Sequence, residues 1–459
     1  MIINKLDNVE VNIKDGHKYA LRDIKSGEMI MKYGCPIGYA TQNIQKGEHV
    51  HTHNVKTNLS GKITYRYQYK DYGLKPRTSD RSFLGYRRKN GEVGIRNEIW
   101  IVNTVGCVNK IAERLAERTG ARCFPHPFGC SQLGDDQKLT QLILRGMVHH
   151  PNAAGVLVLG LGCENNNIKV FQKMLGSYDT NRVRFLNCQE NEDEIAEGIR
   201  LIEELQAYAD TFKREPFPIS KLRIGLKCGG SDGYSGITGN PLVGSLSDRL
   251  ISYGGSCVLT EVPEMFGAEH LLMERCESKE VFDKTVDLIN RFKEYYERHN
   301  QVIYENPSPG NKDGGITTLE EKSLGCVQKG GLSPVVDVLD YGDMVKRSGL
   351  SLLNGPGNDM VAVTNLMAAG VHMILFTTGR GTPLGSAVPT VKIATNQWLA
   401  DRKKNWIDFD ASPLLRGNAM EDLTDTLLDY VIAVASGEPT KNELNQYWEI
   451  SIFKDGVTL

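Results

Sequence analysis

The sequence predicts an α/β protein in which a small N-terminal all-β domain precedes α/β domains with largely parallel, buried sheets. Short alternating segments, separated by turns such as KSGE and QKGE, fill residues 1–65 and predict the β domain. From residue 83 onward, apolar strands that end in glycine-rich loops alternate with amphipathic helices, as in Rossmann-like units. The length of 459 residues also requires more than one domain.

The predicted elements follow one another in a simple order. Short strands are expected in NVEVNI, KYALRDI, EMIMKYG, PIGYATQNI and EHVHTHNV. The tyrosine-rich, irregular residues 66–82 predict a linker. Buried strands, each followed by a helix, are expected in EIWIVNTVGC, AAGVLVLGLGC and LRIGLKCGGSDGYSG. Prolines at 216 and 218 predict a boundary, so we expect α/β domains over 83–215 and 216–459.

Composition and charge exclude several classes of protein. A formal net charge of −2 gives no electrostatic basis for binding nucleic acid or an anionic membrane surface. No apolar run approaches the roughly 20 residues that span a bilayer, and the charged start MIINKLDNVE does not resemble a signal peptide. We therefore expect a cytoplasmic protein without nucleic-acid or membrane partners. The oligomeric state stays open, a homo-oligomer included.

Several of the ten cysteines directly follow predicted strands, beside glycine. Ligands of open α/β sheets bind beyond the carboxyl ends of the strands, so such cysteines are candidate site residues. No two cysteines have C-x-x-C spacing, so any metal site must combine distant segments. A lone cysteine is more often a small buried hydrophobic residue, but the shared position after a strand indicates ligands. These candidates are Cys107, Cys130, Cys163, Cys228 and Cys326.

Other side chains near these cysteines could complete a metal site. Glu164 follows Cys163 directly, and His126 lies four residues before Cys130. Thiolate, imidazole and carboxylate ligands together suit iron or zinc better than magnesium.

Two glycine-rich loops predict a binding site for an anion. GGSDGYSG contains Ser231 and Asp232, and GRGTPLG contains Arg380. Backbone N–H groups in such loops bind phosphate or carboxylate groups. Neither loop matches a dinucleotide or Walker pattern, so a sugar carboxylate is a better prediction than a nucleotide. The alternative interpretation, that Arg380 forms an ordinary salt bridge, stays open.

The segment HTHN places His51 and His53 two residues apart, beside Asn54. In an extended strand, residues i and i+2 point to the same face, so the two imidazoles would project together. The residues alone leave two interpretations open: a metal-binding or proton-transfer pair, and a solvated polar strand.

Long segments of the chain resemble the altronate and galactarate dehydratase family. HVHTHNVKTNLSG is similar to the N-terminal SAF domain of that family. FLGYRRKNGEVGIRNEIWIVNTVGC, LKCGGSDGYSGITGNP, TEVPEMFGAEH and GNKDGGITTLEEKSLGCVQKGG are similar to its body, and the resemblance covers nearly the whole chain. The family includes sulfolactate sulfo-lyases, in which the SAF module can be a separate subunit. The fused module here therefore favours a sugar-acid dehydratase, with altronate as the first choice of substrate.

The resemblance implies β-elimination of water to a 2-keto-3-deoxy sugar acid. Fe²⁺ is the expected metal, Mn²⁺ is an alternative, and an iron–sulfur cluster on Cys107, Cys130 and Cys163 is a further one. Other functions that stay open are galactarate dehydration, sulfolactate sulfo-lyase activity and non-catalytic binding of a sugar acid. We expect the catalytic residues to be His51, His53, His126 and Lys227. We expect the metal ligands to be His51, His53, Cys130, Cys163 and Glu164. We expect the substrate contacts to be Asn54, Cys107, Ser231, Asp232 and Arg380.

Overall fold

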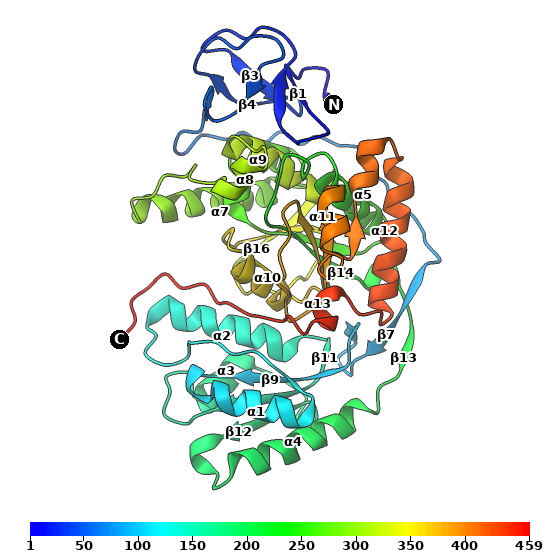
Figure 1. Cartoon of the computed structure of the whole chain (residues 1–459). Coiled ribbons are helices and arrows are strands. Elements are labelled where there is room, and N and C mark those ends of the chain that lie inside the picture. The colour runs from blue at the N-terminus through cyan, green and yellow to red at the C-terminus, as the bar shows by residue number, and fades with distance from the viewer.

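The protein consists of three parts arranged in a row (Figure 1). The computed structural model describes residues 1–459. The N-terminal β domain lies at one end, the C-terminal α/β domain in the middle, and the second domain at the other end, although it directly follows the β domain in sequence. The predicted fold class is confirmed, because a small domain of antiparallel sheets precedes two domains built on parallel sheets.

The N-terminal domain contains two small antiparallel sheets of three strands each. Alternating residues of these strands, such as Val9, Val11 and Ile30, are buried, whereas their neighbours are partly or fully exposed. The period of two therefore gives each sheet one apolar face, against which the other sheet packs. The strands are β1 (Val9–Val11), β2 (Lys18–Ala20), β3 (Met29–Lys32), β4 (Cys35–Ala40), β5 (His49–Val50) and β6 (Val55–Lys56).

The chain between β6 and β7 contains no helix or strand, yet it is fastened to the C-terminal domain. Thr57 Oγ1 donates to Glu320 Oε1 at 2.8 Å, and the Tyr67 hydroxyl donates to the Cys276 carbonyl at 3.1 Å. Tyr65 donates to Glu269 in the same way. The tyrosines that mark this linker in the sequence are therefore anchors on the C-terminal domain.

The second domain has a four-stranded parallel sheet in the order β10-β9-β11-β12. Every residue of β11 is buried, and side chains of successive residues point to opposite faces: Val156 and Val158 pack toward α2, and Leu157 and Leu159 toward α1 and α4. The strands are β9 (Glu98–Asn103), β10 (Arg122–Cys123), β11 (Ala153–Gly160) and β12 (Val183–Asn187). The helices are α1 (Asn109–Thr119), α2 (Gly134–His149), α3 (Ile168–Leu175) and α4 (Glu194–Ala209).

A small antiparallel sheet connects the second domain to the C-terminal domain. It consists of β7 (Ser82–Arg87), β8 (Val93–Gly94) and β13 (Arg214–Pro218), in the order β13-β7-β8. The chain enters the second domain through β7 and leaves it through β13, so the expected boundary at residue 216 falls inside β13.

The C-terminal domain is built on a seven-stranded parallel sheet in the order β16-β17-β15-β14-β18-β19-β20. Helices α5 and α12 pack together on one face, and α10 lies on the other face, where it contacts α2 of the second domain. The strands are β14 (Arg223–Cys228), β15 (Ser256–Leu259), β16 (Val335–Leu339), β17 (Gly349–Leu353), β18 (Met373–Thr378), β19 (Thr390–Ala394) and β20 (Phe409–Asp410). The helices are α5 (Gly239–Ser252), α6 (Glu269–Met273), α7 (Lys279–Arg298), α8 (Pro309–Asp313), α9 (Leu319–Cys326), α10 (Asp359–Ala368), α11 (Gln397–Arg402), α12 (Met420–Ala435) and α13 (Lys441–Leu444).

The N-terminal domain packs on the C-terminal domain through α9. Buried side chains of the β domain, among them Ile30 and Ile37, belong to the same hydrophobic core as Leu324 and Val327. The two domains therefore share one apolar core although the linker and the whole second domain lie between them in sequence. No helix in the structure has both the length and the apolar character that crossing a membrane requires.

Candidate metal centre and active site

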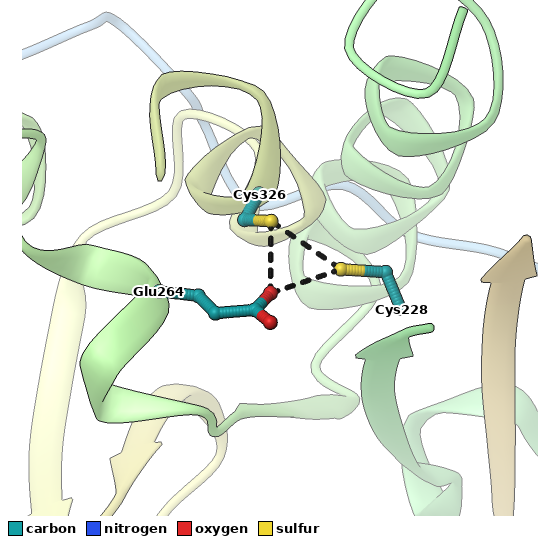
Figure 2. Close-up of side chains that lie close together, drawn as sticks. All are labelled: Cys228, Glu264 and Cys326. Atoms are coloured by element: carbon teal, nitrogen blue, oxygen red, sulfur yellow. Dashed lines mark hydrogen bonds between the residues drawn. The ribbon is translucent and has the colours of Figure 1, made fainter. Parts of the chain in front are cut away.

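Two cysteines and one glutamate converge inside the C-terminal domain (Figure 2). Cys228 is the last residue of β14, and Glu264 lies in a 3₁₀ turn (Val262–Met265) that follows the neighbouring strand β15. Cys326 is the last residue of α9. Because the carboxyl ends of parallel strands meet at one edge of the sheet, the first two side chains are brought together directly.

The three ligand atoms are close enough to contact one another. The sulfur atoms of Cys228 and Cys326 lie 3.3 Å apart. Glu264 Oε2 lies 3.4 Å from the sulfur of Cys228 and 3.1 Å from that of Cys326. All three side chains are buried, and both cysteines are free thiols.

Positively and negatively charged side chains surround this centre in equal numbers. Lys329 Nζ lies 2.8 Å from Cys228 Sγ, and Lys322 Nζ lies 2.8 Å from Glu264 Oε1. Lys227 pairs with Glu261 and lies 2.7 Å from Asp359 Oδ1. With both thiols protonated, three ammonium groups therefore face three carboxylates, from Glu261, Glu264 and Asp359.

The donor set fits a divalent transition metal. A metal ion displaces the thiol protons, so one divalent ion in place of two protons leaves the charge balance of this buried cluster unchanged. The hydrogen bond with Cys228, together with burial, raises the pKa of the Cys326 thiol. Burial opposes ionisation of Glu264, but Lys322, Lys227 and Lys329 together outweigh it and hold the pKa of this carboxyl below its ordinary value. Two soft thiolates and one carboxylate suit iron or zinc better than magnesium.

Glu261 adopts an uncommon backbone conformation next to this centre. Its φ of 71° lies in the left-handed region, which a non-glycine residue occupies at a cost of roughly 1–3 kcal/mol. The conformation directs its carboxylate to Lys227 and to the backbone N–H of Cys228, which donates at 3.2 Å. Such strain is typical of functional sites that the surrounding fold holds in place.

A cavity of about 570 Å³ opens beside the metal centre. Glu264, Lys322 and Asp359 reach it from the centre side. Most of its lining residues are polar. Other lining residues include Gly229, Gly230, Asn306, Ser308, Asn311 and Asn358.

The histidines of the N-terminal domain gather at its contact with the C-terminal domain. His17 Nδ1 lies 3.0 Å from His49 Nε2, and the ring centroids of His51 and His53 lie 5.4 Å and 5.5 Å from that of His49. His51 Nδ1 lies 2.9 Å from Thr317 Oγ1 in the C-terminal domain. Burial, and to a smaller extent Lys18, lower the pKa of His51 to about 4, so its imidazole is neutral at physiological pH.

The extended strand expected through HTHN is not formed. Strand β5 ends at Val50, and residues 51–54 form a turn. Asn54 causes this turn: its Oδ1 accepts from the backbone N–H of His51 and its Nδ2 donates to the carbonyl of His49, both at 2.9 Å. The side chain of Asn54, expected to contact substrate, is buried and binds the backbone of its own turn.

His126 and Glu164 hold loops of the second domain in place. His126 uses both ring nitrogens, with Nε2 2.9 Å from the Asn103 carbonyl and Nδ1 accepting from the Phe128 N–H, and burial lowers its pKa. Glu164 Oε1 accepts from Thr104 Oγ1 at 2.7 Å. The Glu164 carboxylate also accepts hydrogen bonds from two backbone N–H groups of its own loop. These contacts give both residues a structural task, and the catalytic role expected of His126 and the metal-binding role expected of Glu164 stay predictions.

The five expected metal ligands do not form one group. His51 and His53 lie in the N-terminal domain, whereas Cys130, Cys163 and Glu164 lie in the second domain at the opposite end of the molecule (Figure 1). Cys107, expected to contact substrate, also lies in the second domain and is exposed.

The remaining expected residues lie in the C-terminal domain. Lys227 is fully buried, and Asp359 and Glu261 more than offset burial and raise its pKa, so it is an ammonium group and not a base. Asp232 is buried and accepts from Thr395 Oγ1 and Asn396 Nδ2. Arg380 and Asp232 line a second cavity of about 570 Å³, beside the N-terminal domain. Ser231, in the same glycine-rich loop, is buried and its hydroxyl has no hydrogen-bond partner.

Glu264 and three of its neighbours were not expected from the sequence. Glu261 and Glu264 lie in TEVPEMFGAEH, and Lys322 and Lys329 in EEKSLGCVQKGG. Their only signal is the presence of charged residues in segments that also contain apolar residues and glycine. Cys228 and Cys326 carried a stronger signal, since both adjoin glycine and Cys228 also follows a predicted strand.

Comparison with known proteins assigns the whole chain to one family. The models for the altronate/galactarate dehydratase SAF domain, the second domain of D-galactarate dehydratase/altronate hydrolase and the C-terminal domain of D-galactarate/altronate dehydratase match residues 2–58, 85–210 and 219–458. The chain is 53% identical to altronate dehydratase of Escherichia coli (strain K12), over 99% of this chain and 95% of that protein. It is also 53% identical to altronate dehydratase of Bacillus subtilis (strain 168), over 98% and 93%. Identity to galactarate dehydratase (L-threo-forming) of E. coli is 32%, over 95% and 88%.

The chain therefore belongs to the altronate/galactarate dehydratase family, and it is an enzyme of the hydro-lyase class. Within this family it is more similar to these two altronate dehydratases than to this galactarate dehydratase. The resemblance found in the sequence is confirmed.

Proposed function

We propose that the enzyme removes water from altronate and forms a 2-keto-3-deoxy sugar acid. The observation that supports this substrate is the 53% identity to two altronate dehydratases over nearly the full chain, compared with 32% for the galactarate dehydratase. Galactarate, which differs in carrying a carboxylate at both ends, is the second candidate.

We propose that Cys228, Glu264 and Cys326 hold a divalent iron ion. Mn²⁺ prefers oxygen ligands, so two thiolates among three donors favour iron. When bound, such an ion supplies Lewis-acid stabilisation of the negative charge that develops on the substrate. The buried ammonium groups of Lys322 and Lys329 contribute fixed positive charge in the same place.

The cavity beside Glu264 is the proposed substrate site. Lys322 offers a positive charge for the substrate carboxylate, and it is held in place by Asn306 Oδ1 at 3.0 Å and Asn311 Oδ1 at 3.1 Å. The amide groups of Asn306, Asn311 and Asn358 suit hydroxyl groups of a sugar acid, because an amide both donates and accepts.

Proton removal from C2 is assigned to Asp359. Its side chain is 37% exposed where it lines the cavity, and Lys227 fixes one of its oxygens at 2.7 Å. A carboxylate that is held in one orientation and open to the substrate meets the geometric requirement for a general base. Lys227, which is fully buried, is then a positioning residue for Asp359.

The test is turnover of purified enzyme that is kept reduced and supplied with Fe²⁺. We expect D-altronate to yield 2-keto-3-deoxy-D-gluconate without any nicotinamide or nucleotide. Turnover of galactarate but not altronate would move the assignment to the second candidate. Release of sulfite from sulfolactate, without turnover of any sugar acid, would refute the dehydratase assignment.

A further inference from the structure

Three exposed cysteines of the second domain share one structural position. Cys107, Cys130 and Cys163 each follow a glycine, in VGC, FGC and LGC, and each lies in the loop after a strand of the same sheet. The strands β10, β9 and β11 are adjacent and parallel, so their carboxyl ends meet at one edge. The fold therefore gathers three thiols from segments up to 56 residues apart at this edge.

Hydrogen bonds tie the three loops to one another. The Gly106 N–H donates to the Phe128 carbonyl at 2.9 Å, which joins the loop of Cys107 to that of Cys130. The Asn166 N–H donates to the Gly129 carbonyl at 3.0 Å, which joins the loop of Cys163 to that of Cys130. The Ser131 N–H adds a third link, to Asn165 Oδ1 at 3.0 Å.

The glycines before the cysteines permit this close approach. A Cβ on Gly129, whose φ is +101°, would lie only 2.0 Å from the Thr104 carbonyl oxygen. A Cβ on Gly106 would lie 2.7 Å from the His126 carbonyl oxygen. Only glycine fits between these loops, so the positions of Cys107 and Cys130 relative to each other are built into the backbone.

The three thiols have no structural task of their own. Cysteine is among the most buried residue types, yet all three are exposed. Their hydrogen bonds are limited to weak contacts, of Cys163 with Gln189 at 3.6 Å and of Cys130 with Ser131 at 3.8 Å. A set of exposed thiols at one sheet edge offers soft ligands to a thiophilic metal group.

We propose that Cys107, Cys130 and Cys163 bind an iron–sulfur cluster through three thiolates, as a metal centre separate from the one at Cys228. A cluster spans a wider separation of its ligands than a single ion does. In this structure only Cys228, Glu264 and Cys326 bring three ligand atoms within 4.8 Å of one another, so the exposed thiols stand too far apart to share one ion at about 2.3 Å from each sulfur.

The surroundings of the thiols also fit a cluster with one open iron. Four-iron clusters usually take four cysteine ligands, and the second domain offers only three exposed ones. The nearby side chains of Asn165 and Gln189 are neutral amides, which leave one iron accessible to a small oxygen ligand.

The experiment is anaerobic reconstitution of the full chain with Fe²⁺ and sulfide, followed by assay of acid-labile sulfide and visible absorbance. We expect sulfide to be bound by the wild-type protein and to fall at least tenfold in each of Cys107→Ser, Cys130→Ser and Cys163→Ser. Cys123→Ser, which changes a partly buried thiol of the same sheet, is the matched control and retains the sulfide.

Two further measurements separate this centre from the proposed iron ion and from misfolding. Cys228→Ser lowers total iron without lowering sulfide, because the two centres lie in different domains. Thermal unfolding stays unchanged in the three serine variants, because their side chains are exposed. Absence of bound sulfide in the wild type, or equal retention in all three variants, would overturn the proposal.

Discussion

Glu321 of the C-terminal domain accepts a hydrogen bond of 2.7 Å from Lys32 of the N-terminal domain, and both side chains are only 1% exposed. Its other oxygen lies 2.9 Å from Lys18, which also donates to the Gly315 carbonyl at 2.6 Å. Burial opposes ionisation of Glu321, but Lys18 and Lys32 prevail and lower its pKa to about 2. One carboxylate thus binds two ammonium groups across the contact between two domains.

Glu321→Gln should destabilise the protein strongly. The substitution keeps the shape of the side chain but leaves two lysines without their counter-charge in a buried contact, which costs about 3–5 kcal/mol. Chemical denaturation measures the free energy of unfolding. Glu28→Gln, which breaks an exposed pair with Arg22, is the control and should change it by less than about 1 kcal/mol. Equal effects of both substitutions would contradict a structural role for the buried pair.

Stability should fall in acid in two steps. His51 has its pKa lowered from 6.5 to about 4, so its contribution is complete above pH 6.5 and is lost as pH falls through 4. Glu321 has its pKa lowered from 4.5 to about 2, so its contribution is lost between these values. Denaturation at a series of pH values should show a shallower slope between pH 6.5 and 4 for His51→Gln than for wild type. An unchanged slope would show that His51 titrates normally in the folded state.

Cys228→Ser should abolish tight iron binding at the proposed centre. It removes one of two soft ligands, and loss of the ion's charge stabilisation should lower kcat by about 10²-fold or more. Iron content after desalting and kcat are measured together. Cys257→Ser, which alters a buried thiol in the adjacent strand β15, should retain both iron and activity if the variant folds. Wild-type iron content in Cys228→Ser would refute the ligand assignment.

Two variants decide which residue removes the proton from C2. Asp359→Asn should lower kcat by about 10²-fold to 10⁴-fold, the usual range for a lost general base. The catalytic role expected of His51 and His53 from the sequence stays a prediction. His51→Ala tests this role in the same assay. A loss of kcat in His51→Ala as large as in Asp359→Asn would bring the histidine cluster into the chemistry. Full activity of Asp359→Asn would remove this residue from the mechanism.

The repeating part of the fold was predictable from the sequence because it rests on local patterns. Continuous apolar runs that end in glycine, such as AAGVLVLGLGC, became buried parallel strands, and the short alternating segments became antiparallel strands. The HTHN turn was missed because alternating polar residues suit a strand and a turn equally. Here Asn54 decides the outcome by binding the backbone of the turn.

The candidate metal centre was only partly predictable. Cys228 and Cys326 could be found as glycine-flanked cysteines at the ends of elements. Glu264 could not, because its position depends on a 3₁₀ turn and on a contact with a helix end 62 residues away. Glu164 has the same residue type and a similar place after a strand, but its own loop engages its carboxylate. Residue type and spacing do not distinguish these two outcomes.

The linker that carries Tyr65 and Tyr67 has a consequence for how the domains stay together. It joins the N-terminal domain covalently to β7 of the same chain that forms the docking surface, so docking is an intramolecular event. For a short flexible connection the effective concentration of one partner near the other is on the order of millimolar, whatever the concentration of the protein. Because Tyr65 and Tyr67 are hydrogen-bonded to the C-terminal domain, the free part of the linker next to the N-terminal domain is shorter than the whole linker. The linker therefore keeps the N-terminal domain docked on the C-terminal domain even when the protein is diluted. Two separate chains with the same contacts would dissociate on dilution.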